Sequence, residues 1–466
     1  MKKLHLKVLE QEIDTNNIWS EDKLERKQCA EVLTNLIRGQ EKSLVLSING
    51  YWGSGKTFFL KRWQKQLEVK EGFKAIYFNA WESDYFGDPL VAIIGQIWKV
   101  LKESDFKEIV NTIKETAKPL FEKTIFNTVK TLTSGIIKFD KDELKSSSEK
   151  VIEDYIEQEK NKKELRKRLT QLAKEIFQKE RKPFVFIIDE LDRCRPTFAI
   201  ELLERIKHVF DIPNMIFILG IDRKQLSSSI KAVYGNIDVD GYLHRFFDMD
   251  FQLPFSDCSM FCEYLLDKYG AKTFMQEKGN NVNKIHAKDF DNFQDYFISF
   301  SNSFEFSLRE IEHAIRIFIC TVKNIKDNSH MYPELLVVLI VLRLKKHKLY
   351  IEYTSGKCQA CKVIDFIMNA LKSSPLEEKL SLNNLEASIY ALGSDRSSND
   401  IIRKQLTLLK EKKTTALEYL SERTKALSSD ELEDLIKLYE KIAGKNISVL
   451  GYLSKKIELS SLLIKT

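Results

Sequence analysis

Residues 48–57 read INGYWGSGKT, and they constrain the fold of this chain more than any other stretch. Gly50 and Gly55 stand five positions apart, and Lys56 and Thr57 follow directly. The pattern G-x-x-x-x-G-K-[ST] is typical of a loop whose backbone N–H groups surround phosphates, whose lysine reaches the terminal phosphates and whose hydroxyl ligates Mg²⁺. Such a loop needs a strand before it and a helix after it, because the helix N-terminus attracts anions.

The flanking residues supply this context. Leu44–Ile48 is an apolar run that predicts a buried strand, and Phe58–Trp63 can begin a helix. Because motif and context agree, we interpret the stretch as a phosphate-binding loop, the alternative being a surface turn that matches by chance. The residues expected to bind the nucleotide are Gly50, Tyr51, Trp52, Gly53, Ser54, Gly55, Lys56, Thr57 and Phe58.

A second apolar run ends in two acidic residues. Phe184–Ile188 predicts another buried strand, and Asp189 and Glu190 follow it. An aspartate there can hold the hydrated Mg²⁺ together with Thr57, and the adjacent glutamate can polarise the attacking water. This pair predicts a hydrolysing enzyme and argues against a non-hydrolysing nucleotide-binding scaffold. An acidic helix N-cap is the alternative interpretation.

Strands and helices alternate along the first half of the chain. Residues 74–81 predict a strand, and Asp88-Pro89 predicts a helix start with proline in the first turn. An amphipathic helix at 199–210 precedes an apolar run at 215–220. Apolar strands alternating with helices indicate an α/β fold with a three-layer parallel sheet.

The pattern also suggests how the chain is divided. We expect a nucleotide-binding core at residues 1–255, with a mostly helical insertion at about 100–180 whose last part, 151–180, is one charged helix. Residues 256–365 and 366–466 carry no strand pattern and are expected to be helical, the latter as an interaction region.

Charge and hydropathy exclude several classes of protein. Lys plus Arg number 74 and Asp plus Glu 68, so the net charge of +6 is mild for 466 residues and does not indicate a nucleic-acid partner. Basic residues at 162–168 alternate with glutamates, which favours a solvated face over a nucleic-acid patch. The apolar run Leu335–Leu342 is too short to span a bilayer, and no signal peptide is visible. We therefore expect a cytoplasmic protein without a transmembrane segment.

Seven cysteines, an odd number, suggest reduced thiols. Cys358 and Cys361 form a C-x-x-C pair, and a structural zinc site would need a second pair such as Cys258 and Cys262. The latter pair lies in an apparent amphipathic helix, so we favour ordinary thiols over zinc.

Several ordered motifs carry a resemblance to a known family. GYWGSGKT at 50–57, FNAWESDYFGDPL at 78–90 and FIIDELDRCRP at 186–196 resemble the KAP family of P-loop NTPases. The resemblance covers roughly residues 20–320. It implies a P-loop fold of the ASCE type, a helical lid at 256–365 and ATP as the nucleotide.

The resemblance also implies roles for single residues. Lys56 and Thr57 take the phosphate and Mg²⁺ roles, Asp189 the second metal role and Glu190 that of general base. Asp222 follows the strand at 215–220, where related ATPases keep a polar sensor of the γ-phosphate.

Two arginines are candidates on the same basis. Arg245 in YLHRFF is a candidate arginine finger, with an ordinary surface arginine as the alternative. Arg309 in SLRE begins a lid helix that Ser307 is expected to cap, at a position where related ATPases often carry a second sensor arginine.

Many KAP members carry transmembrane helices between the phosphate loop and the acidic strand. Here residues 100–150 are rich in lysine, so the chain resembles a soluble member. Because some bacterial members are linked to phage exclusion, the resemblance implies an ATP-driven switch or assembly factor in antiviral defence. Such a switch would form a homo-oligomer and control an effector protein. The alternative is a motor or sensor that nucleic acid stimulates.

Overall fold

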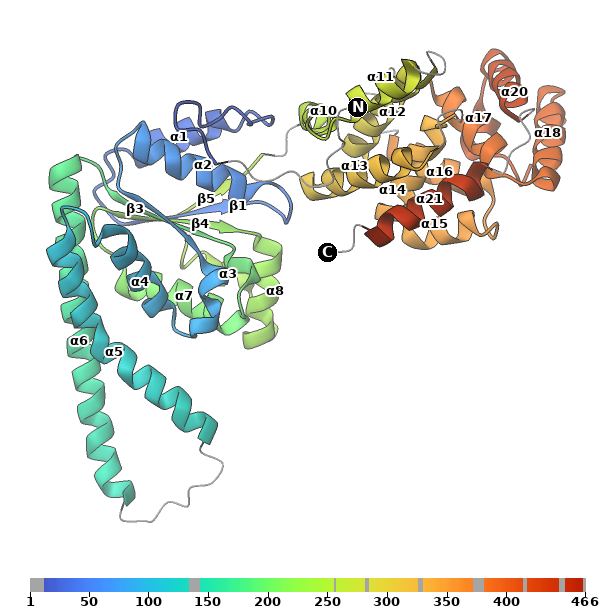
Figure 1. Ribbon diagram of the computed structural model, residues 1–466. Helices are drawn as coiled ribbons and strands as arrows, with labels where there is room; N and C mark the ends of the chain where they lie inside the picture. Colours follow the sequence, from blue (N-terminus) through green and yellow to red (C-terminus); the bar gives the residue numbers. More distant parts are fainter. Residues whose placement is uncertain are drawn as a thin grey trace. The chain divides into compact units, whose positions relative to one another are not determined.

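The computed structural model describes residues 12–133, 143–254, 257–280, 285–325, 330–371, 381–413, 417–443 and 449–463. The chain divides into two units, one over residues 12–255 and the other over residues 256–466 (Figure 1). The first unit contains a sheet with its helices, and the second is built from helices.

Five parallel strands form the sheet of the first unit, in the order β2-β3-β4-β1-β5. The strands are β1 (Leu44–Asn49), β2 (Ala75–Asn79), β3 (Phe184–Asp189), β4 (Met215–Ile221) and β5 (Met249–Gln252). Asn79 pairs with Asp189, and Asn49 pairs with both Ile221 and Gln252, so the carboxyl ends of all five strands lie at one edge. The predicted parallel α/β sheet is confirmed.

Helices cover both faces of this sheet, which gives the three predicted layers (Figure 1). The main helices are α1 (Lys27–Ile37), α2 (Lys56–Val69), α4 (Pro89–Leu101), α7 (Pro196–Val209) and α8 (Arg223–Tyr234). Val185 and Ile187 of β3 pack on the side of α1 and α2, whereas Phe186 and Ile188 pack on the side of α4 and α7. Both faces are buried, which explains why β3 is apolar at nearly every position.

Short elements at the carboxyl edge of the sheet determine where its strands stop. They are α3 (Ala80–Ser83) and the 3₁₀ turns η1 (Asp84–Phe86) and η2 (Leu191–Arg193), whereas α9 (Val239–Leu243) lies between α8 and the start of β5. β2 ends two residues earlier than predicted, because the Asn79 side chain accepts hydrogen bonds from the backbone N–H groups of Trp81 and Glu82 and caps α3.

Two long helices, α5 (Lys107–Thr133) and α6 (Glu143–Glu180), extend from this unit as a projection (Figure 1). Leu165, Leu169 and Leu172 of α6 are buried against the body of the unit. α6 begins eight residues before the predicted start at 151; residues 143–150 contain no glycine or proline, so nothing in their composition stops the helix. Among the helices that the structure describes, no stretch is both long enough and apolar enough to cross a membrane.

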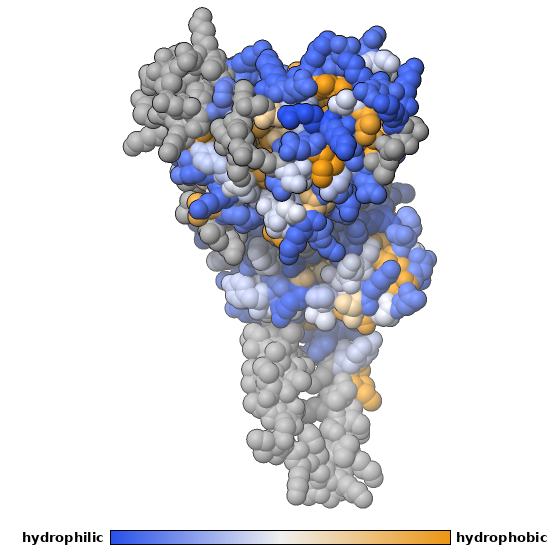
Figure 2. Space-filling model, turned by 90° about the vertical axis from the view of Figure 1, so that its right-hand side faces the viewer, coloured by the Kyte–Doolittle hydropathy of each residue, from blue (hydrophilic) through white to orange (hydrophobic). Residues whose placement is uncertain are grey.

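The second unit is a set of packed helices. They are α10 (Ser259–Lys268), α11 (Ala271–Asn280), α12 (Ile285–Ser303), α13 (Leu308–Lys323), α14 (Pro333–Lys345), α15 (His347–Thr354), α16 (Ala360–Leu371), α17 (Leu382–Gly393), α18 (Arg396–Lys410), α19 (Glu422–Ala426), α20 (Ser429–Ala443) and α21 (Val449–Leu463). α14 contacts α12, α13, α17 and α21, so Leu335–Leu342 is buried on all sides. Figure 2 shows a mainly hydrophilic face over this unit, with apolar side chains in small groups.

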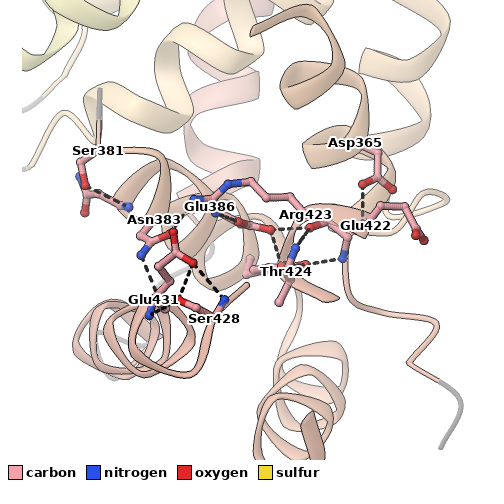
Figure 3. A network of polar contacts seen from close by, with 12 residues as sticks. Asp365, Ser381, Asn383, Glu386, Glu422, Arg423, Thr424, Ser428 and Glu431 are labelled. Atoms are coloured by element: carbon pink, nitrogen blue, oxygen red, sulfur yellow. Dashed lines mark hydrogen bonds and ion pairs between the residues drawn. The ribbon is translucent and has the colours of Figure 1, made fainter. Parts of the chain in front are cut away.

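A buried ionic network joins α17 to α19 in this unit (Figure 3). The carboxylate of Glu386 is fully buried and accepts hydrogen bonds from the hydroxyls of Ser421 and Thr424. It also forms an ion pair with Arg423, whose Nη2 donates to Oδ1 of Asn383 over 2.9 Å. Both oxygens of the Glu386 carboxylate therefore have hydrogen-bond donors, and the negative charge is paired with the Arg423 guanidinium.

We expect Arg423→Met to lower the free energy of unfolding by about 3–5 kcal/mol, because the variant leaves the Glu386 carboxylate buried without its cation. Urea unfolding followed by circular dichroism measures the change. Lys425→Met is the control, since Lys425 pairs with the exposed Glu422 and its loss costs about 1 kcal/mol or less. Equal losses in the two variants would contradict this account of the network.

Candidate functional site

The phosphate loop occupies the interval between Asn49, the end of β1, and Lys56, the start of α2. Gly55 has a φ of 85°, in the left-handed region that favours glycine. A Cβ on Gly50 would lie 2.7 Å from Oγ of Ser54 and 3.2 Å from Cγ of Lys56, so a side chain there would displace the two polar side chains of the loop interior. The predicted order of strand, loop and helix is confirmed.

The interior of the loop presents polar atoms. Nζ of Lys56 donates to the backbone carbonyls of Gly50 and Tyr51. Oγ of Ser54 is buried and has no hydrogen-bond partner within the described ranges. Burial lowers the pKa of Lys56, whereas the carboxylate of Asp192 is the strongest influence in the opposite direction. An ammonium and a free hydroxyl in a glycine-rich turn fit the acceptor oxygens of a phosphate chain.

The remaining predicted loop residues lie around this interior. The aromatic side chains of Tyr51 and Trp52 are exposed at the tip of the loop. Thr57 is the second residue of α2, and the ring of Phe58 stacks on the guanidinium of Arg62, 3.6 Å from its centroid.

Asp189 is the last residue of β3. This strand pairs with β4, which in turn pairs with β1, the strand that leads into the phosphate loop. The Asp189 carboxylate is buried and accepts hydrogen bonds from the Tyr77 hydroxyl and from the backbone N–H of Glu190, both over 2.8 Å. Burial and this carboxylate raise the pKa of Tyr77, which therefore stays a hydrogen-bond donor. A Cβ on Gly220 of β4 would lie 2.9 Å from Oδ1 of Asp189 and 2.4 Å from Cδ1 of Leu60, so glycine leaves the space that Asp189 occupies.

Glu190 is held on both sides. Its Oε1 pairs with Nη1 of Arg193 over 2.7 Å, and its Oε2 accepts a hydrogen bond from Nδ2 of Asn79 over 3.2 Å. The guanidinium of Arg193 lies 5.6 Å from the ring centroid of the exposed Trp81. Glu190 has a φ of 61°, a conformation that non-glycine residues rarely adopt outside turns and functional sites.

Asp222, the predicted sensor, connects β4 to the loop. Its Oδ2 accepts a hydrogen bond from the backbone N–H of Trp52 over 2.9 Å. Its Oδ1 accepts from the backbone N–H groups of Lys224 and Gln225 and so caps α8. The carboxylate thus fixes the tip of the phosphate loop relative to the sheet.

Asp192 is a site residue for which the sequence suggested no role. It lies in η2, is only 6% exposed, and its Oδ2 accepts a hydrogen bond from Nε1 of Trp52. Burial raises the pKa of Asp192, while Lys56 is the largest influence that lowers it and the backbone N–H of Asp222 also favours the ionised form.

Arg245 lies at the opposite edge of the sheet from the loop. It precedes β5, and the neighbouring Asp248 bonds with the backbone of Val45 near the start of β1. The loop follows Asn49, the other end of that strand, and a rise of about 3.3 Å per residue puts roughly 13 Å of strand between Val45 and Asn49. The exposed Arg245 is therefore not brought together with the loop of its own chain.

Arg309 is the second residue of α13 in the helical unit. Ser307 caps this helix as predicted: its Oγ accepts a hydrogen bond from the Glu310 N–H, and the Glu310 carboxylate accepts one from the Ser307 N–H.

The cysteines form no disulfide in the described part of the chain. Cys258 and Cys262 are fully buried in and beside α10, and burial raises the pKa of Cys262 and Cys361. Across the residues that the structure describes, no group of three or more His, Cys, Asp or Glu side chains is placed to hold a metal.

The residues at the carboxyl edge nevertheless fit a nucleotide with Mg²⁺. The hydroxyl of Thr57 and the carboxylate of Asp189 are hard oxygen ligands of the kind that Mg²⁺ prefers, and this ion takes its remaining ligands from phosphates and water. A loop between β1 and α2, with an acidic pair ending β3 in the same sheet, defines a P-loop NTPase.

The family follows from the match to known sequences. The model of the KAP family P-loop domain matches residues 26–325. The chain therefore belongs to the KAP family of P-loop NTPases, as the resemblance of its motifs predicted, and the family supports nucleotide hydrolysis in general.

Similar proteins are distant. The phage T7 exclusion protein of Escherichia coli K12 is 24% identical over 241 residues, which are 46% of this chain and 30% of that protein. Aeropyrum pernix ORC2 in its ADPNP–ADP complexes matches with a TM-score of 0.32 at 14% identity, over 90% of this chain and 94% of that one. Drosophila ORC bound to GC-rich DNA and Cdc6 matches with a TM-score of 0.29 at 14% identity, over 97% of this chain and 64% of that one.

Proposed function

We propose that this protein is a Mg²⁺-dependent ATPase that acts as a switch: ATP turnover changes the state of a homo-oligomer that controls an effector protein. The observation that carries the proposal is the acidic pair Asp189-Glu190 at the same edge of the sheet as the Lys56 loop. The similarity to the phage T7 exclusion protein supports defence against phage as the setting.

Each residue of the site has a part in the hydrolysis. Lys56 holds the terminal phosphates, and Thr57 and Asp189 hold the Mg²⁺, which neutralises phosphate charge when it is bound. Glu190 accepts a proton from water as the water oxygen bonds to the terminal phosphorus and the bond to the bridging oxygen breaks. Asn79 orients the Glu190 carboxylate, and Arg193 restrains it through the ion pair.

The position of Arg245 supports an oligomer. An arginine at the far edge of the sheet cannot serve the loop of its own chain, but it can reach the nucleotide of a neighbouring copy that is stacked head to tail. Arginine fingers supplied in this way stabilise the charge that develops on the transferred phosphoryl group. On this proposal, turnover per molecule rises with protein concentration.

We expect Arg245→Ala to lower turnover by about 10³-fold or more while ATP binding stays unchanged, because the finger acts on the transition state in a neighbouring site. Steady-state turnover and calorimetric binding test this at several protein concentrations. Mixing Arg245→Ala with Lys56→Ala should restore activity, since one copy then supplies the finger and the other the loop.

Lys231→Ala, which removes an exposed cation of α8, is the control and should behave like the wild type. A turnover per molecule that is independent of both concentration and Arg245 would exclude the shared site.

The basic residues of α6 support a solvated face instead of a nucleic-acid interface. Lys162 pairs with Glu159 over 3.3 Å and Arg168 with Glu164 over 2.9 Å, and Arg166 donates to the backbone carbonyl of Asp211 over 2.6 Å. Turnover measured with and without single-stranded and double-stranded DNA and RNA tests the alternative directly, because a nucleic-acid-stimulated motor would respond and the proposed switch would not.

A further inference from the structure

The carboxylate of Asp192 has one oxygen that the protein leaves without a partner. Oδ2 accepts a hydrogen bond from the Trp52 indole. The backbone N–H groups of Asp222 and Asp192 also favour the ionised carboxylate, but neither makes a hydrogen bond of normal geometry to Oδ1, which has no partner in the part of the chain that the structure describes. The side chain is 6% exposed, so solvent does not compensate. A buried, unsatisfied carboxylate oxygen costs free energy, and its usual explanation is a bound water or ion.

The surroundings of Asp192 indicate which ligand fits. Lys56, whose ammonium faces the phosphate chain in this class of loop, is the charged group that acts most strongly on Asp192. Asp189 lies three residues earlier, at the end of β3. The Asp192 carboxylate, which accepts a hydrogen bond from Trp52 of the phosphate loop, therefore lies beside the loop that carries Lys56 and close to the carboxyl end of β3, where Asp189 lies.

The balance of charge points to a cation. Asp189, Glu190, Asp192 and Asp222 contribute four carboxylates around the loop, and they outnumber the cations Lys56 and Arg193. A triphosphate brings further negative charge, and like charges that are close together in a buried site repel strongly. A hydrated divalent ion satisfies both requirements, because it neutralises charge and its waters donate hydrogen bonds.

We propose that Oδ1 of Asp192 accepts a hydrogen bond from a water molecule of the nucleotide-bound Mg²⁺, so that Asp192 and Asp189 hold the same hydrated ion. Asp192 is then a positioning residue for the metal. This role rests on the proposed ATPase function and adds a second carboxylate to it. An outer-shell partner of this kind changes metal affinity by about 10–100-fold when it is removed.

Asp192→Asn tests the proposal, because asparagine keeps the shape and can still accept the Trp52 hydrogen bond but has lost the charge. We expect the dissociation constant of Mn²⁺ to rise about 10-fold or more in the complex with adenosine 5′-(β,γ-imido)triphosphate, as measured by electron paramagnetic resonance. Binding of the same nucleotide in EDTA should not weaken, because no metal contributes to it.

Asp211→Asn is the matched control. It makes the same substitution at an exposed aspartate that precedes the start of β4, far from the phosphate loop, so the affinity for Mn²⁺ should stay at the wild-type value. Asp192→Ala is a second variant in case asparagine disturbs folding, and it should weaken Mn²⁺ binding more than Asp211→Asn does. Melting curves establish that each variant is folded.

Two results would overturn the proposal: an unchanged affinity for Mn²⁺ in Asp192→Asn, or a loss of nucleotide binding in EDTA as large as the loss for Mn²⁺. The second would mean that Asp192 only holds the loop through Trp52. Failure of the wild-type protein to bind the nucleotide at all would instead reject the ATPase function.

Discussion

Glu190→Gln will bind ATP about as well as the wild-type protein and will turn it over about 10²–10⁴-fold more slowly. Glutamine has nearly the shape of glutamate and can keep a hydrogen bond with Asn79, but it cannot accept a proton from water. The change thus removes the proposed base and leaves the phosphate loop intact. Binding is measured by calorimetry with Mg²⁺, and single-turnover hydrolysis isolates the chemical step.

Glu82→Gln is the matched control for this variant. Glu82 lies near the same edge of the sheet, and its carboxylate accepts a hydrogen bond from the same Asn79 amide over 3.0 Å. We expect the control to change turnover by less than about tenfold, because Glu82 has no part in proton transfer. Normal turnover in Glu190→Gln would remove Glu190 as the base and transfer that role to another group.

Lys56→Ala will lose both binding and turnover. The lysine supplies the ammonium inside the loop, and charge-assisted hydrogen bonds of this kind contribute about 1.5–3 kcal/mol each. Losing two such bonds to phosphate oxygens corresponds to a drop in ATP affinity of at least about 100-fold. The variant should fold normally, because burial of the Lys56 ammonium is itself unfavourable.

Lys65→Ala provides the comparison on the same helix. Lys65 is partly exposed on α2 and its ammonium is 3.9 Å from the Glu68 carboxylate, so its loss leaves the loop unchanged. Calorimetric titration of both variants with ATP separates the role of the loop from a general effect of charge. Tight residual binding by Lys56→Ala would count against the assignment of the loop as the nucleotide site.

The sequence was sufficient where function depends on residues close together in the chain. The spacing of Gly50, Gly55 and Lys56 specifies a local turn between a strand and a helix, and the acidic pair directly follows an apolar run. Both features can be read without the order of the strands. The parallel sheet could be predicted for the same reason, because alternating apolar strands and helices leave few other arrangements.

Contacts between strands could not be predicted in this way. Asn79 meets Glu190 because β2 pairs with β3. Arg245 lies away from the loop because β5 runs parallel to β1, and the residues that lead into β5 bond with Val45 near the start of β1. Strand order depends on tertiary packing, on which hydropathy patterns carry no information. Asp192 and Arg193 belong to the motif FIIDELDRCRP at 186–196, but the motif does not reveal their partners, because these depend on how η2 packs against the phosphate loop.

The hydrogen bonds of Trp52 have a practical consequence. Trp52 lies at the tip of the phosphate loop and is 44% exposed. Its indole N–H donates a hydrogen bond to the Asp192 carboxylate, and its backbone N–H donates one to Asp222. Indole fluorescence responds to both solvent contact and nearby charge, so the loop carries its own optical probe. The chain has four other tryptophans, of which Trp81 is also exposed and lies beside Arg193, so comparison with Trp52→Phe identifies the part of the emission that comes from Trp52. Emission from the unlabelled protein can therefore follow the arrival and departure of nucleotide in stopped-flow experiments, without any attached dye.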